Sequence, residues 1–202
     1  MLYNIKTILD PSQLDRGNTA AVNIYNWGGS YRPKTEATLC YVKDRGFIVR
    51  LLCAETAPRA VHTKADSPVC EDSCLEFFVN FQPDKPGNGY INFEGNANGA
   101  MLCHYGPSRN ARSSIVSMGL SHPVPTVIQT AANWGWQLLI PLSWIHTLYG
   151  SVSYSTGSRI RGNFFKCGDK TDSPHYASYT KIDSPNPDFH RPEYFANMII
   201  TD

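Results

Sequence analysis

The chain has 202 residues, with 18 Lys and Arg against 17 Asp and Glu and a formal net charge of +1, and its basic residues are scattered singly. This balance argues against nucleic acid or an anionic membrane as a partner. Apolar residues make up 42% and charged residues 17% of the chain, which is typical of one globular domain, expected here to span residues 1–202.

The N-terminal sequence MLYNIKTILD lacks the cationic start and apolar stretch of a signal peptide, and no run in the chain approaches 18 apolar residues. We therefore expect a cytoplasmic protein from the sequence as given, or an extracellular one if a signal has been removed.

Three β-hairpins are predicted along the chain. The first is TLCYVKDRGFIVRLLC at residues 38–53, where two alternating apolar runs flank a turn that ends at Gly46. The second spans residues 90–105, and the third joins residues 126–131 to residues 136–142 around Trp134. We expect Trp134 to be exposed at the third turn and Trp136 to pack in the core.

The rest of the chain also favours strands. They are predicted at residues 74–81, 114–120, 159–167, 175–182 and 194–201. Only residues 141–150 look helical, with Pro141 in the first turn and Gly150 as a stop. One short helix among nine or ten strands predicts an all-β fold, a jelly-roll-like sandwich of two antiparallel sheets.

The strand at residues 74–81 carries an acidic residue, Glu76, among apolar ones. With a period of two, Leu75, Phe77 and Val79 share the face toward the core, and Glu76 lies on the opposite face. A structural interpretation is therefore a solvated carboxylate, or one that pairs with Lys166 across the sheet.

Six cysteines are present, but a domain of this size does not depend on disulfides, and we expect free thiols. Cys70 and Cys74 have no companion pair at the spacing of a zinc ribbon. Structural calcium is a further expectation, because the loops at residues 66–72 and 169–172 are rich in carboxylates.

Five short motifs, in this order along the chain, resemble the family 9 carbohydrate-binding modules. They are D-S-x-x-E-F-F from Asp72, Y-x-x-F-x-x-N from Tyr90, W-x-x-x-I-P-L from Trp136, R-x-N-F-x-K from Arg161 and F-x-x-P-E-x-F from Phe189. The resemblance extends from about residue 20 to the end of the chain. It implies a β-sandwich in which two aromatic side chains clamp the end of a sugar chain.

The resemblance also implies which residues bind the sugar. The two clamp positions fall at Val69 and Phe189, the strand glutamate of the family matches Glu76, and a loop asparagine matches Asn186. Glu94 stands where the family has an arginine. The implied function is non-catalytic binding of poly- or oligosaccharide ends in carbohydrate catabolism, with glycoside hydrolases as associated partners.

The chemistry of a pyranose ring favours the same residues as candidates for ligand binding. Its C–H face stacks on an aromatic ring, and its hydroxyls both donate and accept hydrogen bonds, for which carboxylates and amides are strong partners. The expected ligand-binding residues are Glu76, Glu94, Asn186, Phe189, Val69, Asn92 and Tyr179, with Trp27 and His190 as further candidates.

Two other functions stay open. Glu76 and Glu94 on neighbouring strands could be the paired carboxylates of a glycoside hydrolase. A haem or redox module could use Met101 with His104 or His175 as axial ligands. No catalytic residue is assigned, because no G-x-S-x-G or H-E-x-x-H motif is present.

Overall fold

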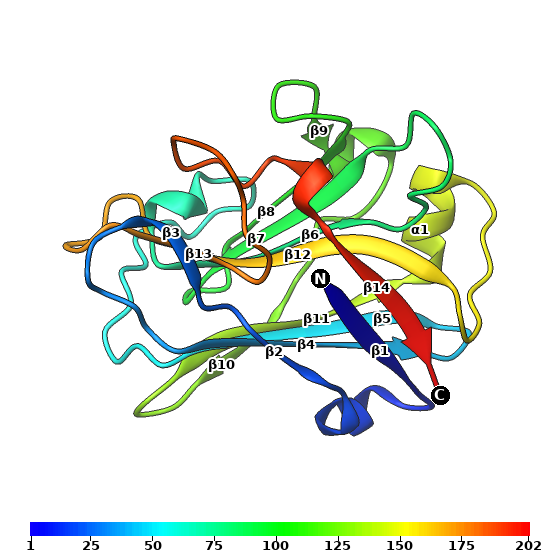
Figure 1. Cartoon of the computed structure of the whole chain (residues 1–202), viewed down its shortest axis with the longest axis horizontal. Coiled ribbons are helices and arrows are strands. Elements are labelled where there is room, and N and C mark those ends of the chain that lie inside the picture. The colour runs from blue at the N-terminus through cyan, green and yellow to red at the C-terminus, as the bar shows by residue number, and fades with distance from the viewer.

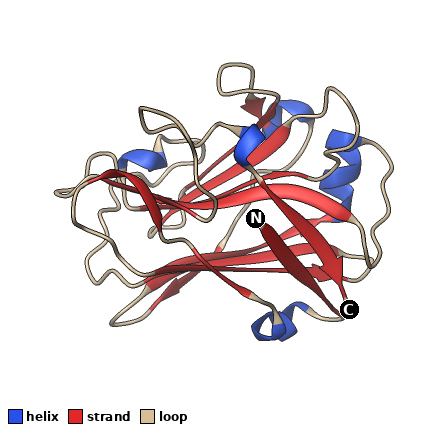
Figure 2. Ribbon diagram, viewed as in Figure 1, coloured by secondary structure: helices blue, strands red, loops and turns tan.

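The computed structural model describes the whole chain, residues 1–202, and is built mainly of strands (Figures 1 and 2). The strands are β1 (Leu2–Ile8), β2 (Thr19–Ala21), β3 (Ile24–Gly28), β4 (Thr35–Val42), β5 (Gly46–Cys53), β6 (Cys74–Asn80), β7 (Tyr90–Asn96), β8 (Met101–Gly106), β9 (Ser113–Ser114), β10 (Thr126–Gln129), β11 (Trp134–Pro141), β12 (Arg159–Cys167), β13 (His175–Ser178) and β14 (Ala196–Thr201). The helices are α1 (Leu142–Tyr149) and four short 3₁₀ helices, Pro11–Arg16, Val69–Glu71, Ile115–Met118 and Pro192–Tyr194.

The strands pair into one continuous, curled sheet in the order β10-β11-β5-β4-β1-β14-β12-β6-β7-β8-β9. In Figure 1 the sheet forms two layers, with β4, β5, β10 and β11 below and β6, β7, β8 and β12 above. β1 and β14 run side by side and connect the two layers, and β1 pairs in parallel with both β4 and β14. The fold is thus mostly β with a mixed sheet, and the expected pair of separate antiparallel sheets is not confirmed.

All three predicted hairpins are present as antiparallel pairs, β4 with β5, β7 with β8, and β10 with β11. In the third, the turn precedes Trp134, because the backbone N–H of Thr130 already bonds to the carbonyl of Asn133 at 2.8 Å. Trp134 is therefore the first residue of β11 and only 1% exposed, so the prediction of an exposed Trp134 was wrong. Trp136 is fully buried, as predicted.

The strand predicted at residues 114–120 is instead the 3₁₀ helix Ile115–Met118. The side chain of Ser114 accepts a hydrogen bond from the backbone of Val116, and Gly119 ends the helix with a φ of 84°. A serine cap and a left-handed glycine are helix signals that the apolar pattern concealed. The helix predicted at residues 141–150 is confirmed as α1, and its C-cap is Gly150.

Strand β6 is buried on both faces. Between the layers, Phe77 stacks on Phe164, with ring centroids 5.0 Å apart. On the other face of the same strands a second apolar cluster forms beneath the loops, where Phe78 packs edge-on against Phe165 at 4.9 Å. Glu76 belongs to this second face and is only 2% exposed, so the interpretation of it as a solvated carboxylate was wrong.

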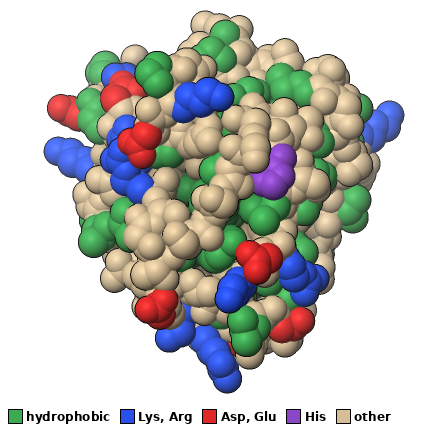
Figure 3. Space-filling model, turned by 90° about the vertical axis from the view of Figure 1, so that its right-hand side faces the viewer, with side chains coloured by type: hydrophobic (Ala, Val, Ile, Leu, Met, Phe, Trp, Pro, Cys, Tyr) green, Lys and Arg blue, Asp and Glu red, His purple; other side chains and the backbone are tan.

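The molecular surface carries mixed charge. On the face in Figure 3, acidic and basic side chains lie close to one another and between apolar ones. The longest helix, α1, has eight residues, and no helix has the length and apolar character to cross a membrane. All six cysteines are free thiols.

Candidate functional site

A pocket of about 230 Å³ opens on the outer face of the upper layer. Strands β6, β7 and β12 form its floor, and the loop that contains residues 187–190 forms a wall. Its lining residues are Cys70, Glu76, Glu94, Arg109, Cys167, Asp169, Tyr176, Pro187, Asp188, Phe189 and His190.

Two buried glutamates lie side by side in the floor. Glu76 of β6 is the direct cross-strand partner of Glu94 in β7, and they are 2% and 5% exposed. Oε1 of Glu76 accepts a hydrogen bond from Sγ of Cys167 at 3.0 Å, and Oε1 of Glu94 accepts one from Nδ2 of Asn92 at 2.8 Å. The other oxygen of each carboxyl accepts no hydrogen bond from the protein and is not sealed from the pocket.

Burial and proximity raise the pKa of both carboxyl groups. For Glu76, burial and then the neighbouring Glu94 raise the pKa well above its usual range. Burial raises the pKa of Glu94 to about 7, although the Arg112 guanidinium, 4.0 Å from its Oε1, favours the ionised form. Two adjacent carboxyl groups resist joint ionisation. The pair therefore holds a proton near neutral pH and offers both a hydrogen-bond donor and acceptors.

Phe189 forms the apolar wall. Its ring stacks on Phe165, with centroids 4.2 Å apart and planes at 13°, and lies 6.3 Å from the ring of Trp27. Tyr176 meets Phe189 edge-on at 6.4 Å. Phe189 is only 8% exposed, so the pocket meets part of a ring that is otherwise packed in the core.

The rim combines a neutral histidine with an ion pair. Nδ1 of His190 is hydrogen-bonded to the hydroxyl of Tyr90 at 2.9 Å, and its ring lies 4.8 Å from that of Phe78. Burial lowers the pKa of His190 to about 2. Nη2 of Arg109 donates to Oδ1 of Asp188 at 3.0 Å, which ties the loop after β8 to the wall of the pocket.

Of the seven residues expected from the sequence to bind a ligand, three line this pocket, namely Glu76, Glu94 and Phe189, and so does the further candidate His190. Asn92 lies on the same face of β7 as Glu94 but is fully buried and does not line the pocket, and its Nδ2 donates to Glu94. Asn186 is exposed and precedes the lining residue Pro187.

The other two expected residues lie elsewhere. Val69 is fully enclosed in the second apolar cluster and does not line the pocket. The hydroxyl of Tyr179 donates to the carbonyl of Leu2, and its ring packs against Tyr3 and Phe164. Motif spacing gave the position of Val69 along the chain and sugar chemistry suggested Tyr179, but neither argument gave the direction of the side chain.

Sequence reasoning missed the polar residues that loops contribute. Asp188 flanks Phe189 and His190, so proximity in sequence could have identified it. Arg109 and Asp169 come from loops whose approach depends on the tertiary fold.

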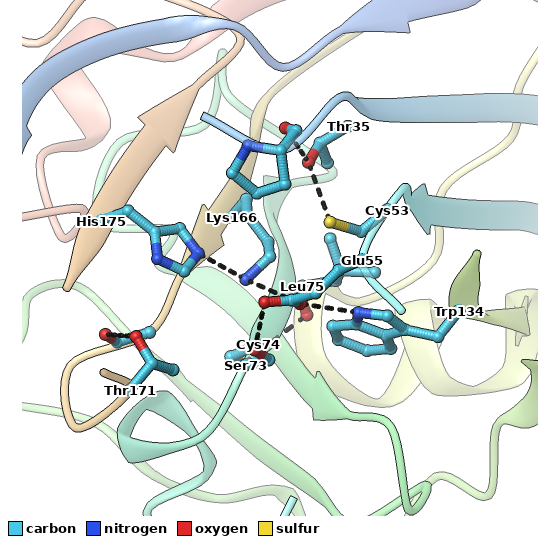
Figure 4. Close-up of polar contacts among 12 residues, drawn as sticks. Thr35, Cys53, Glu55, Ser73, Cys74, Leu75, Trp134, Lys166, Thr171 and His175 are labelled. Atoms are coloured by element: carbon cyan, nitrogen blue, oxygen red, sulfur yellow. Dashed lines mark hydrogen bonds and ion pairs between the residues drawn. The ribbon is translucent and has the colours of Figure 1, made fainter. Parts of the chain in front are cut away.

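A second polar cluster surrounds Lys166, which is fully buried (Figure 4). In the sheet Phe165, and not Lys166, is opposite Glu76, so Lys166 points to the other face and the expected pairing with Glu76 was wrong. Nζ of Lys166 instead donates to Nε2 of His175 at 2.7 Å and lies 3.7 Å from Oε2 of Glu55.

Glu55 in this cluster is bonded by protein donors. It accepts from Nε1 of Trp134 at 2.9 Å and from Oγ of Ser73 at 3.0 Å (Figure 4). It also accepts from the hydroxyl of Tyr31 at 3.1 Å. A larger cavity of about 410 Å³ opens beside it. Because its buried carboxylate already has partners, we regard this cluster as structural and the Glu76–Glu94 pocket as the functional candidate.

The side chains expected to bind haem or calcium contact other groups of the protein. Met101 is enclosed in the core between the layers, whereas Nε2 of His104 lies 3.7 Å from Asp66. Asp66 accepts hydrogen bonds from Ser114 and from the backbone of Cys103. Both ligand sets stay predictions.

Comparison with known proteins identifies the family of this chain. The profile of carbohydrate-binding family 9 matches residues 4–200. The chain belongs to this family. The family predicted from the five motifs is thus confirmed, and the profile extends to almost the full chain. A search of curated proteins found no match.

Solved structures resemble this family 9 domain over its full length. A candidate carbohydrate-binding protein from Bacteroides uniformis is 25% identical, with a TM-score of 0.82 and 99% of each chain covered. A family 9 module from Caldicellulosiruptor kristjanssonii in complex with cellotriose has 10% identity and a TM-score of 0.69, over 99% of this chain and 93% of that one. Its complex with glucose has 9% identity and a TM-score of 0.68, over 100% and 96%. At such identities these two complexes show a shared fold.

Proposed function

We propose that this family 9 domain binds the end of a poly- or oligosaccharide in the pocket above Glu76 and Glu94, without cleaving it. The observation that carries the proposal is a buried pair of carboxyl groups, each with one oxygen free of protein partners, beside the aromatic wall of Phe189. Family membership and the carbohydrate complexes of similar structures support the ligand class.

The chemistry of the floor suits sugar hydroxyls. A hydroxyl can donate to the ionised carboxylate and accept from the protonated one, and charge-assisted hydrogen bonds are roughly twice as strong as neutral ones. The pocket volume of about 230 Å³ is below the roughly 300–1,000 Å³ of pockets for drug-sized ligands. This size favours one terminal sugar unit over the middle of a chain.

The further expectations from the family are also part of the proposal. The two layers of the curled sheet would act as a sandwich of the family type, and the domain would work beside glycoside hydrolases in carbohydrate catabolism. Asn186 would contact the ligand from the rim, next to the lining residue Pro187.

Calorimetric titration with glucose, cellotriose and other oligosaccharides tests the proposal. Phe189→Leu keeps an apolar side chain in the cluster but removes the ring, and we expect it to lose about 1 to 3 kcal/mol of binding free energy. The matched control is Phe195→Leu, because Phe195 is buried in the same cluster but does not line the pocket. Equal affinity of wild type and Phe189→Leu for every sugar bound would contradict the proposed site.

A glycoside hydrolase is the second candidate, because the raised pKa of both carboxyl groups also suits a general acid. Incubation with oligosaccharides and measurement of new reducing ends distinguishes the two functions. We expect no product from the wild type. Hydrolysis that is lost in Glu94→Gln would overturn the non-catalytic assignment.

A further inference from the structure

Three potential metal ligands meet in the floor of the pocket. Sγ of Cys74, Sγ of Cys167 and a carboxyl oxygen of Glu76 all lie within 4.8 Å of one another, and all three residues are buried. Cys74 and Cys167 are direct cross-strand partners in β6 and β12, so the sheet itself fixes their proximity. Glu76 is two residues after Cys74 and therefore points to the same face of β6.

We propose that Cys74, Cys167 and Glu76 form a binding site for a thiolate-seeking divalent cation of the zinc class. The site shares Glu76 and Cys167 with the lining of the pocket, but its existence does not depend on the proposed function.

The donor set and its spacing fit such an ion. Zinc is held by thiolate and carboxylate ligands at about 2.3 Å and 2.0–2.2 Å, so two sulfurs around one tetrahedral ion are roughly 3.8 Å apart. Donor atoms that already lie within 4.8 Å reach this geometry with small side-chain rotations. Each thiol gives up its proton to solvent when it coordinates, and the ion supplies the positive charge that stabilises two buried thiolates.

An ion can reach this cluster through the pocket. Cys167 and Glu76 both line the pocket, whereas Cys74 lies behind them and is fully buried. Oε1 of Glu76 is the oxygen that meets Sγ of Cys167, at 3.0 Å. The second oxygen accepts no hydrogen bond from the protein, so one glutamate can offer one oxygen to the ion and the other to a sugar.

Cobalt titration of the reduced, sugar-free protein tests the site, because cobalt bound by thiolates gives a charge-transfer band in the near ultraviolet. We expect this band to saturate at one equivalent of Co²⁺ and to disappear when Zn²⁺ is added. Cys74→Ser and Cys167→Ser should each abolish the band. The matched control Cys40→Ser should keep it, because Cys40 is a buried thiol in a separate cluster.

Two further variants keep the proposal falsifiable if either serine variant fails to fold. Glu76→Gln leaves both thiols in place and should weaken cobalt binding at least about tenfold. Cys70→Ser removes the partly exposed thiol of the pocket wall and should leave the band unchanged.

No band at saturating cobalt, or a band that is lost only in Cys70→Ser, would overturn the site. The second outcome would mean that the metal binds only to an accessible surface thiol. The proposed function is tested separately by sugar titrations in the presence of a chelator, so either proposal can fail alone.

Discussion

Asp72 is fully buried, and its Oδ2 accepts hydrogen bonds from the backbone N–H groups of Val61 and His62, each at 3.0 Å, and from Nδ2 of Asn96 at 2.8 Å. Asn163, in another of the five motifs, similarly accepts from the backbone of Thr180 at 3.0 Å. These motif residues hold loops against the upper layer. Motif similarity therefore reports the fold more directly than it reports the ligand.

Asp72→Ala should destabilise the protein by about 2 to 4 kcal/mol, because it leaves two backbone donors and an amide without their buried partner. Urea unfolding measures the change. Asp15→Ala is the control, since Asp15 is exposed and forms a surface ion pair with Arg50, and such pairs contribute up to about 1 kcal/mol. Equal losses in the two variants would argue against the structural role of Asp72.

His190 should make the fold sensitive to mild acid. Because burial holds its folded pKa at about 2, below the ordinary value near 6.5, the unfolded chain binds a proton first as the pH falls. The stability contributed by the neutral ring is present above pH of about 6.5 and is lost progressively below it. The neighbouring Arg112, Arg109 and His104 act in the same direction.

Urea unfolding at pH 7 and pH 5 checks this prediction. In His190→Gln the loss of unfolding free energy between the two pH values should be smaller than in the wild type by roughly 1 to 2 kcal/mol. An identical loss in both proteins would show that other groups cause the acid sensitivity.

Among the elements, hairpins were predictable because their signals are local. Gly46 with a φ of 141° and Gly99 with a φ of 80° mark turns that only a few residue types adopt, and alternating apolar runs flank both. Strands β1, β2 and β3 were not predicted. β1 pairs with β14 and β3 pairs with β13. Both partners lie more than a hundred residues away, so no local turn marks β1 or β3.

Strand β7 shows how closely the two layers approach. A Cβ atom added to Gly95 would lie 2.8 Å from Nε1 of Trp136, the indole nitrogen that donates to the carbonyl of Leu75 at 3.1 Å. Glycine at this position therefore allows Trp136 of the lower layer to reach the upper one.

Gly95→Ala should cost about 1 to 3 kcal/mol of stability, because Trp136 must shift in a closely packed core. Thermal and urea unfolding measure the loss. Gly29→Ala is the control, since no atom lies within 4 Å of the added Cβ there. An unchanged stability of Gly95→Ala would show that the layers can separate at little cost.

At the scale of the whole molecule, sequence identified the floor of the candidate pocket better than its walls. Glu76 and Glu94 follow from strand alternation and the pairing of β6 with β7. Arg109 and Asp188 meet through the side-chain contact of two loops, and Val69 turns into the core instead of the pocket. Residue spacing along a loop does not determine these directions.

The two layers depend on β1, which continues the backbone hydrogen bonding from β4 to β14. Ile5 of this strand is fully buried in the core between the layers. Ile5→Ala should destabilise the protein by about 2 to 5 kcal/mol through lost burial and a cavity. The exposed neighbour Asn4→Ala, measured in the same urea titration, should change stability by less than about 0.5 kcal/mol. Similar effects of both changes would contradict this role for β1.

The parallel pairing of β1 with β14 also has a mechanical consequence. Leu2 is opposite Asn197 and Lys6 is opposite Thr201, so the first strand begins beside the start of the last one, and both run the same way (Figure 1). A pull on the two chain ends would slide these strands past each other and strain all the hydrogen bonds between them together. Resistance to force is set by the rate of unfolding. This shear geometry should slow unfolding under tension, so that the domain stays folded and its ligand stays bound.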